Sequence, residues 1–175
     1  MATDDVVITM ETLNTGAGLN FPVVMKCPFD ITPYIFRFEV AAGETTLAIG
    51  SVCEMLTQTK TLAKPTVGGT FVNYIVLDTE YNKSVLEAAG TTVTKIATFA
   101  ASVFLDVLLL VPGMILSMKI YAGADIEIGE SLIADAEDGA LSVGTTAGAI
   151  IGKILNAIDW TDTTILRYAP VLITR

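Results

Sequence analysis

The carboxylates that stand closest to a catalytic arrangement in this sequence are Asp125, Glu127 and Glu130, with Ile126 and Ile128 between them. Paired acids are the groups that glycoside hydrolysis requires. Alternation of acidic and apolar residues is also typical of a short strand that has one face in solvent and the other in a core. We expect the second arrangement, and therefore predict no catalytic residue in this segment.

Other chemistries fail on residue type or spacing. The chain has no histidine, which excludes Ser-His-Asp triads, Cys-His pairs and histidine metal sites. Residues 148–154 are similar to a phosphate-binding loop, but Ala147 and Ile154 stand where that pattern needs Gly and Ser or Thr. Residues 135–139 are similar to a calcium loop, but Thr146 occupies its twelfth position and offers no carboxylate. We predict a solvated turn there, with an adventitious surface cation as the alternative, and no cofactor or metal site.

Composition indicates one apolar domain that buries surface against other molecules. Of the 175 residues, 52% are hydrophobic and only 17% are charged, against a usual quarter. Such a chain either encloses a large core or covers part of its surface with a partner, and we expect the latter. The net charge is −9 and the ten basic residues are scattered, so neither nucleic acid nor an anionic membrane is an expected partner.

Neither the longest apolar segment nor the N-terminus is expected to be a membrane span or a signal peptide. Residues 96–118 contain only one charged side chain, that of Asp106, and are long enough to cross a bilayer. A carboxylate near the middle, and a Pro-Gly pair after it, favour buried strands instead. The first ten residues lack the basic and apolar regions of a signal peptide. Cys27 and Cys53 are accordingly expected as free thiols, although a disulfide between them stays open.

Glycine and proline divide the chain into short segments rich in β-forming residues. In 34–40, Phe36, Phe38 and Val40 alternate with charged residues, which predicts a strand, and 70–77 is the strongest β segment by residue type. Residues 107–135 are expected to be successive strands joined by tight turns. We expect a turn at 78–83 and a single helical turn at 84–89. The fold prediction is all-β: a sandwich or barrel of about nine to twelve short strands, with at most one or two short helices.

The N-terminus differs from the rest of the chain. Residues 1–20 combine a short apolar segment with a patch of small residues, which fits an arm that docks on a neighbour and equally a frayed terminus. We expect residues 21–175 to form a single β-rich domain. Trp160, flanked by acidic residues, is either a contact residue or a half-buried loop anchor. The interface candidates are therefore Val6, Val7, Ile8 and Trp160.

Two segments of the sequence share one pattern. Residues 38–52 and 118–132 each contain a β-forming segment, an Ala-Gly pair, a second short apolar segment, a glycine and a third apolar segment. Either the chain contains a duplication, or two hairpin-like corners have independently used Ala-Gly turns because glycine tolerates positive φ. The sequence leaves both explanations open.

The order of these features resembles that of tailed-phage head decoration proteins and related virion β-proteins. The resemblance rests on residues 38–52, 111–116, 122–129 and 149–154 and covers about half of the chain. It implies a non-enzymatic capsid decoration or cementing protein on the virion surface. Its partners would be the major capsid protein and further copies of itself, with a homotrimer favoured. The alternatives are a monomeric ligand- or carbohydrate-binding β-barrel and another self-assembling fibre or tail subunit.

Overall fold

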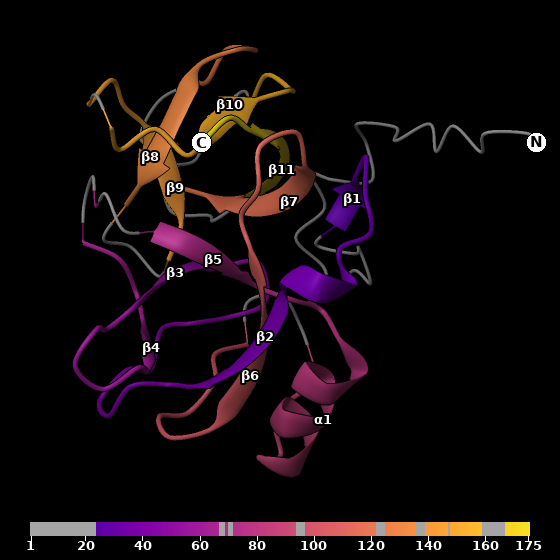
Figure 1. The fold of residues 1–175 in the computed structure, drawn as a ribbon, viewed down its shortest axis with the longest axis vertical. Coiled ribbons are helices and arrows are strands. Elements are labelled where there is room, and N and C mark those ends of the chain that lie inside the picture. Colours follow the sequence, from indigo (N-terminus) through magenta and orange to yellow (C-terminus); the bar gives the residue numbers. More distant parts are fainter. Residues whose placement is uncertain are drawn as a thin grey trace, which may run out of the picture.

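A computed structural model describes residues 24–66, 69, 72–93, 97–121, 125–135, 139–146, 148–158 and 167–175. Within these ranges the regular secondary structure is mostly β-strand (Figure 1). The elements are β1 (Val24–Lys26), the 3₁₀ turn η2 (Thr32–Tyr34), β2 (Ile35–Glu39), β3 (Val52–Met55), β4 (Leu62–Ala63), β5 (Val72–Val76), α1 (Glu80–Ala88), β6 (Phe104–Leu109), β7 (Ile115–Ile120), β8 (Ser131–Ala134), β9 (Leu141–Val143), β10 (Gly152–Ile154) and β11 (Arg167–Ile173). The predicted all-β class, strand count and small helical content are confirmed.

The first half of the described chain closes into a five-stranded barrel. Its strands are hydrogen-bonded in the order β2-β6-β5-β3-β4. A parallel bridge between Val40, which follows β2, and Leu62 of β4 brings the two ends of this sheet together. The N–H of Ala41 donates to the Leu62 carbonyl at 2.8 Å across the same junction. Closure of this kind leaves no exposed sheet edge at the junction.

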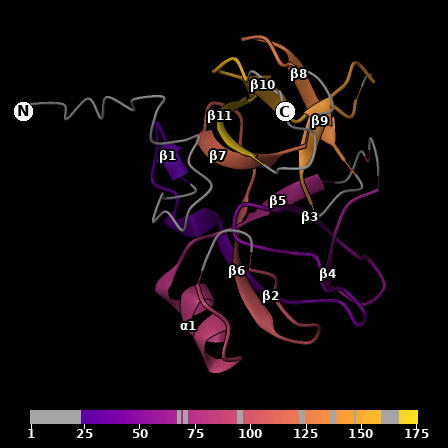
Figure 2. The ribbon, with the colours of Figure 1, turned by 180° about the vertical axis from the view of Figure 1, so that it is seen from behind.

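The second half repeats this arrangement. Its strands pair in the order β7-β11-β10-β8-β9, with β1 added outside β7. Here the closing contact is a parallel pairing of Ile120 with Leu141, and the N–H of Tyr121 donates to the Leu141 carbonyl at 2.7 Å. The two barrels lie one above the other, and the view from behind shows the same division (Figures 1 and 2).

Strand order and closure therefore match between the two halves, and in chain order β2 to β6 are equivalent to β7 to β11. Val40 corresponds to Ile120, and Leu62 corresponds to Leu141, because each pair closes its barrel in the same way. Of the two explanations for the repeated sequence pattern, the structure favours a duplicated unit. We call the two copies repeat 1 and repeat 2. The predicted single domain over 21–175 stays a prediction.

Side chains fill both barrels and the space between them. The buried apolar residues form one continuous cluster that includes Leu47, Phe99 and Leu105 of repeat 1 and Met118 and Leu141 of repeat 2. Closely packed side chains in barrels of only five strands leave little interior space, since about eight strands are needed before a barrel can hold even a small ligand.

The repeats meet at a seam where a turn of repeat 1 lies against β7 and β11. The Tyr168 hydroxyl donates to the Ile49 carbonyl at 3.0 Å, and the Lys119 ammonium lies 3.4 Å from the Ser51 hydroxyl. Gly50 has φ +82°, and a Cβ built on it would lie 2.8 Å from the Tyr168 ring. The seam thus depends on a glycine that lets the backbone approach an aromatic ring.

One helix begins earlier than the sequence predicts. The expected turn at 78–83 and single helical turn at 84–89 are instead one α-helix, α1, over Glu80–Ala88. Thr79 is its N-cap, and its side chain accepts a hydrogen bond from the Asn82 N–H. The helix forms because this cap and the tertiary contacts of Asn82 outweigh the polar character of 78–83.

Candidate interaction surface

Most polar side chains at the junction of α1 with repeat 1 have structural partners. Buried Asn82 donates to the carbonyls of Leu77 (2.7 Å) and Asp106 (2.9 Å) and accepts from the Asp106 N–H at 2.8 Å. These three bonds bind the helix to the point where β5 ends beside β6. This amide holds backbone in place, so it is not available for a ligand.

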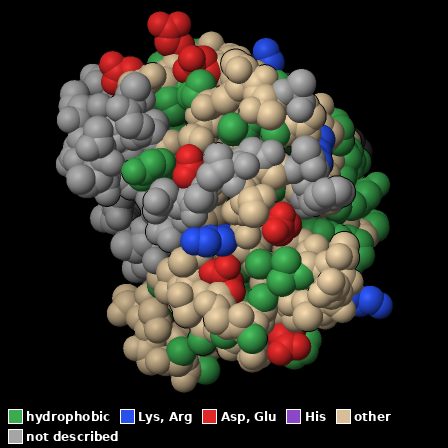
Figure 3. Space-filling model, turned by 90° about the vertical axis from the view of Figure 1, so that its left-hand side faces the viewer, with side chains coloured by type: hydrophobic (Ala, Val, Ile, Leu, Met, Phe, Trp, Pro, Cys, Tyr) green, Lys and Arg blue, Asp and Glu red, His purple; other side chains and the backbone are tan. Residues whose placement is uncertain are grey.

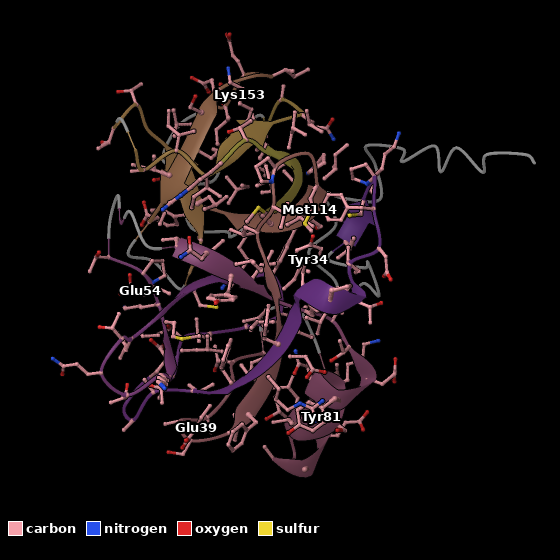
Figure 4. The ribbon with its side chains drawn as sticks, in the orientation of Figure 1. Tyr34, Glu39, Glu54, Tyr81, Met114 and Lys153 are labelled. Carbon is pink, nitrogen blue, oxygen red and sulfur yellow. The ribbon has the colours of Figure 1, made fainter. Side chains whose placement is uncertain are left out.

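The Asp106 carboxylate joins three elements in the same region. It accepts from the Arg37 side chain at 2.7 Å and from the Thr79 hydroxyl at 2.9 Å. The Arg37 guanidinium also lies 3.5 Å from the centroid of the Tyr81 ring, a cation–π contact that links β2 to α1. Figure 4 shows Tyr81 on the helix beside the lower part of the β2-β6 pair. The hydrogen bond that Arg37 donates to the Asp106 carboxylate raises the pKa of the Arg37 guanidinium.

Glu44 performs a similar structural task at the junction that closes repeat 1. Its carboxylate accepts from the Thr46 hydroxyl (2.6 Å), the Thr46 N–H (2.7 Å) and the Lys64 N–H (2.9 Å). Burial alone would raise the pKa of this carboxyl, but the hydrogen bonds together outweigh burial and lower it. Glu44 is therefore ionised in the folded protein and connects the segment after β2 to the end of β4.

The carboxylates around Glu127 are not arranged on a strand. Ile126 forms an isolated bridge with Ile158 and is 2% exposed, whereas Ile128 is 67% exposed. The prediction of a regular alternation with a shared core face is wrong here. A turn begins at Glu127, closed by a bond from the Glu130 N–H to the Glu127 carbonyl and by φ +90° at Gly129, so the two-residue period ends.

The remaining predicted groups are placed as follows. Cys27 and Cys53 are free, as expected, and burial raises the pKa of the Cys53 thiol. Among the described residues, no group of three or more His, Cys, Asp or Glu is placed to hold a metal ion, and no helix is long and apolar enough to cross a membrane. The interface candidates all lie outside the described residues: Val6, Val7, Ile8 and Trp160.

Large apolar side chains exposed on the described surface are the best structural candidates for contacts with other molecules. They come from both repeats: three lie on strands and two, Leu56 and Ile128, lie in the segments between strands. Figure 3 shows that hydrophobic side chains are spread over one face of the molecule among polar ones. These residues are Phe36 (38% exposed), Leu56 (37%), Phe104 (49%), Ile128 (67%) and Val143 (42%). Phe36 stacks on Phe38, and both rings contact Tyr74 edge-on, with centroids 5.6 to 6.2 Å apart.

Sequence reasoning missed the ion pair of Arg37 and Asp106 beside α1. A carboxylate in the middle of a strand-forming apolar segment requires a buried partner, so Asp106 was itself the available signal. The alternation of 34–40 placed Arg37 on the face opposite Phe36, but nothing local indicates that Arg37 and Asp106 are paired across β2 and β6.

No family model matches the chain, and no match was found among curated proteins. Among solved structures, the chain is similar to the head fiber gp8.5 N base of bacteriophage phi29. The two are 11% identical with a TM-score of 0.44, and the match covers 80% of this chain and 94% of the other.

Proposed function

We propose that this protein is a non-enzymatic structural subunit of a virus particle, a decoration protein that binds the outside of the capsid shell and stabilises it. Its partners are the major capsid protein and further copies of itself, with a homotrimer as the expected oligomer. The proposal starts from the sequence resemblance to phage head decoration proteins.

The observation that carries the proposal is the contrast between the polar and the apolar side chains of the described residues. The polar groups buried beside α1 and at the Glu44 junction hold one element to another. The exposed groups include five large apolar side chains, on a protein in which charged residues are scarce. The polar groups thus serve the fold, and the apolar groups face solvent. This combination suits a protein that assembles with others better than an enzyme that acts on a substrate.

The filled barrels argue against a ligand-binding barrel. Small-molecule sites are concave and enclose most of the ligand. The interior positions of both five-stranded barrels, by contrast, hold buried side chains such as Val107 and Ile154. This leaves binding by the outer surface.

The test is a copy-number and binding measurement. Quantitative mass spectrometry of purified virus particles should find the protein in many copies, in fixed ratio to the major capsid protein. Shells assembled without it should bind the recombinant protein saturably and then resist heating better. A protein absent from particles, or one that neither binds nor stabilises shells, would contradict the proposal. Light scattering after size-exclusion chromatography tests the trimer separately.

A further inference from the structure

The turn at Glu127–Glu130 of repeat 2 repeats, bond for bond, the turn by which repeat 1 packs at the seam. In Ala48–Ser51 the Ser51 N–H donates to the Ala48 carbonyl at 3.0 Å, and in Glu127–Glu130 the Glu130 N–H donates to the Glu127 carbonyl at 3.3 Å. Each turn has a glycine of positive φ in third place, at +82° and +90°. Both glycine N–H groups donate at 2.9 Å to the residue that ends the adjacent strand, Val76 or Ile154.

The side chain in fourth place also has the same role in both turns. The Ser51 hydroxyl accepts from the Ala48 N–H at 3.0 Å, and the Glu130 carboxylate accepts from the Glu127 N–H at 2.9 Å. The two turns are therefore equivalent parts of the duplicated unit, and they present the same backbone shape.

Their surroundings are opposite. Ile49 in the first turn is 2% exposed, and the seam covers it, whereas its equivalent Ile128 is 67% exposed. A Cβ on Gly50 would meet the Tyr168 ring, whereas a Cβ on Gly129 would have no described atom within 4 Å. Among the described residues, repeat 2 thus presents an uncovered copy of a turn that repeat 1 uses for docking.

The seam shows what this turn binds: a pair of strands with a lysine and an aromatic ring side by side. Lys119 and Tyr168 are paired across β7 and β11, and the lysine ammonium lies 3.4 Å from the Ser51 hydroxyl. In the second turn a carboxylate, Glu130, takes the place of that hydroxyl. A basic group opposite Glu130 would therefore form an ion pair where the seam has a lysine near a hydroxyl.

A second copy of this chain does not supply such a face. The pair in repeat 1 equivalent to Lys119 and Tyr168 is Glu39 and Phe104, which are paired across β2 and β6. In a head-to-tail contact Glu39 would face Glu130, and two like charges brought together at an interface oppose binding.

We propose that the Glu127–Glu130 turn docks on a different protein, through a β-surface that offers a Lys or Arg opposite Glu130 and an aromatic or apolar side chain against Ile128. Resting on the proposed function, the inference assigns this surface to the capsid shell. One turn is too small for a stable interface, so it is one contact of a larger footprint, repeated at each copy of the subunit.

The experiment measures binding of purified protein to shells assembled without it. Ile128→Asp should weaken binding by about tenfold or more, as expected when an apolar anchor is replaced by a charge. Glu130→Gln keeps an acceptor for the Glu127 N–H and removes only the charge, so it should weaken binding at low salt and have less effect at high salt. Thr57→Asp is the control, because Thr57 is exposed in repeat 1 and is not one of the five apolar contact candidates, and it should bind as the wild type does.

The outcomes separate this inference from the proposed function. If the wild-type protein does not bind shells, the proposed function fails and this inference fails with it. If the wild type binds and Ile128→Asp binds equally well, or Thr57→Asp weakens binding as much, this inference alone is overturned. If Ile128→Asp instead dissociates an oligomer of the free protein in light scattering, the occupant is a second copy and the inference is also overturned. Circular dichroism of each variant checks that the fold is kept.

Discussion

Replacing Asn82 with alanine tests whether one buried amide holds α1 to repeat 1. The side chain is fully buried and makes three hydrogen bonds of 2.7 to 2.9 Å with the backbone of Leu77 and Asp106. A net value of about 1 kcal/mol per bond gives a loss of about 3 kcal/mol. The Asp106 N–H and the Leu77 carbonyl would be left buried without this partner, which is why the loss should be large for a single residue.

The assay is urea-induced unfolding followed by circular dichroism at neutral pH, with Asn73→Ala as the matched control. Asn73 is an exposed asparagine on β5, so its replacement should change the free energy of unfolding by less than about 0.5 kcal/mol. A third variant, Asn82→Asp, keeps the size of the side chain but places a carboxylate against two carbonyls. Its folded-state pKa should be raised, so its deficit should shrink as the pH falls toward 4 and the group becomes able to donate.

The reasoning would be refuted if Asn82→Ala and Asn73→Ala were equally stable, because the three bonds would then contribute nothing that water cannot replace. It would also be refuted if the loss of stability in Asn82→Asp grew as the pH fell. Protonation removes the repulsion between a carboxylate and the carbonyls that it faces, so the loss should become smaller in acid.

Three further predictions concern other parts of the structure. Gly50→Ala should cost at least about 1 kcal/mol more in unfolding free energy than Gly90→Ala, because both glycines have positive φ but only Gly50 faces a tyrosine ring of repeat 2; equal costs in thermal denaturation would contradict a tight seam. Glu44→Gln should lower the free energy of unfolding by about 1 kcal/mol at pH 7. The pKa of Glu44 is lowered in the folded protein, so its contribution to stability is present above pH 4.5 and is lost in acid, and the difference between variant and wild type should vanish well below pH 4.5. A difference in stability that does not change with pH would contradict this assignment. With a chromogenic disulfide reagent at pH 8, Cys27 should react in the native protein and Cys53 only after unfolding, since burial both covers that thiol and raises its pKa; rapid labelling of both thiols would contradict the buried placement.

The sequence predicts the fold class well because strand signals in this chain are local. Alternating and β-branched segments separated by glycine and proline give the strand count, and residues 38–52 and 118–132 carry the duplication in their Ala-Gly and single-glycine pattern. Barrel closure is not local. The bridge between Val40 and Leu62 joins residues more than twenty positions apart, and no side-chain pattern at either residue specifies the partner.

The errors have the same origin. Residues 78–83 are polar, which suits a turn, but a helix begins at Glu80 because Asn82 finds backbone partners at Leu77 and Asp106 that the local sequence does not show. The alternation of Ile126 and Ile128 suits a strand, but Gly129 adopts a positive φ and the turn around it exposes Ile128. The candidate docking turn could have been predicted by aligning the two repeats and noting that Ile49 and Ile128 are equivalent. The sequence could not have predicted that Ile49 is buried and Ile128 exposed, because this depends on which of the two turns packs against the other repeat.

A tandem duplication of a docking unit raises a general physical problem, and the differences between the repeats indicate how this chain meets it. Repeat 1 binds repeat 2 through a turn and a strand pair. The equivalent turn at Ile128 and the equivalent strand pair at Phe104 are uncovered, so the turn of one molecule could bind the strand pair of the next. Head-to-tail contacts of this kind build open filaments unless they close into a ring. At the seam, Ser51 of the turn lies near Lys119 of the strand pair. Their equivalents on the uncovered surfaces are Glu130, in place of Ser51, and Glu39, in place of Lys119. In every self-contact of that geometry, the carboxylates of Glu130 and Glu39 would face each other and repel. A basic group on another protein would instead attract either carboxylate. Like charges at Glu130 and Glu39 would therefore disfavour head-to-tail contacts of this geometry, and the same charge on Glu130 suits the basic partner proposed above.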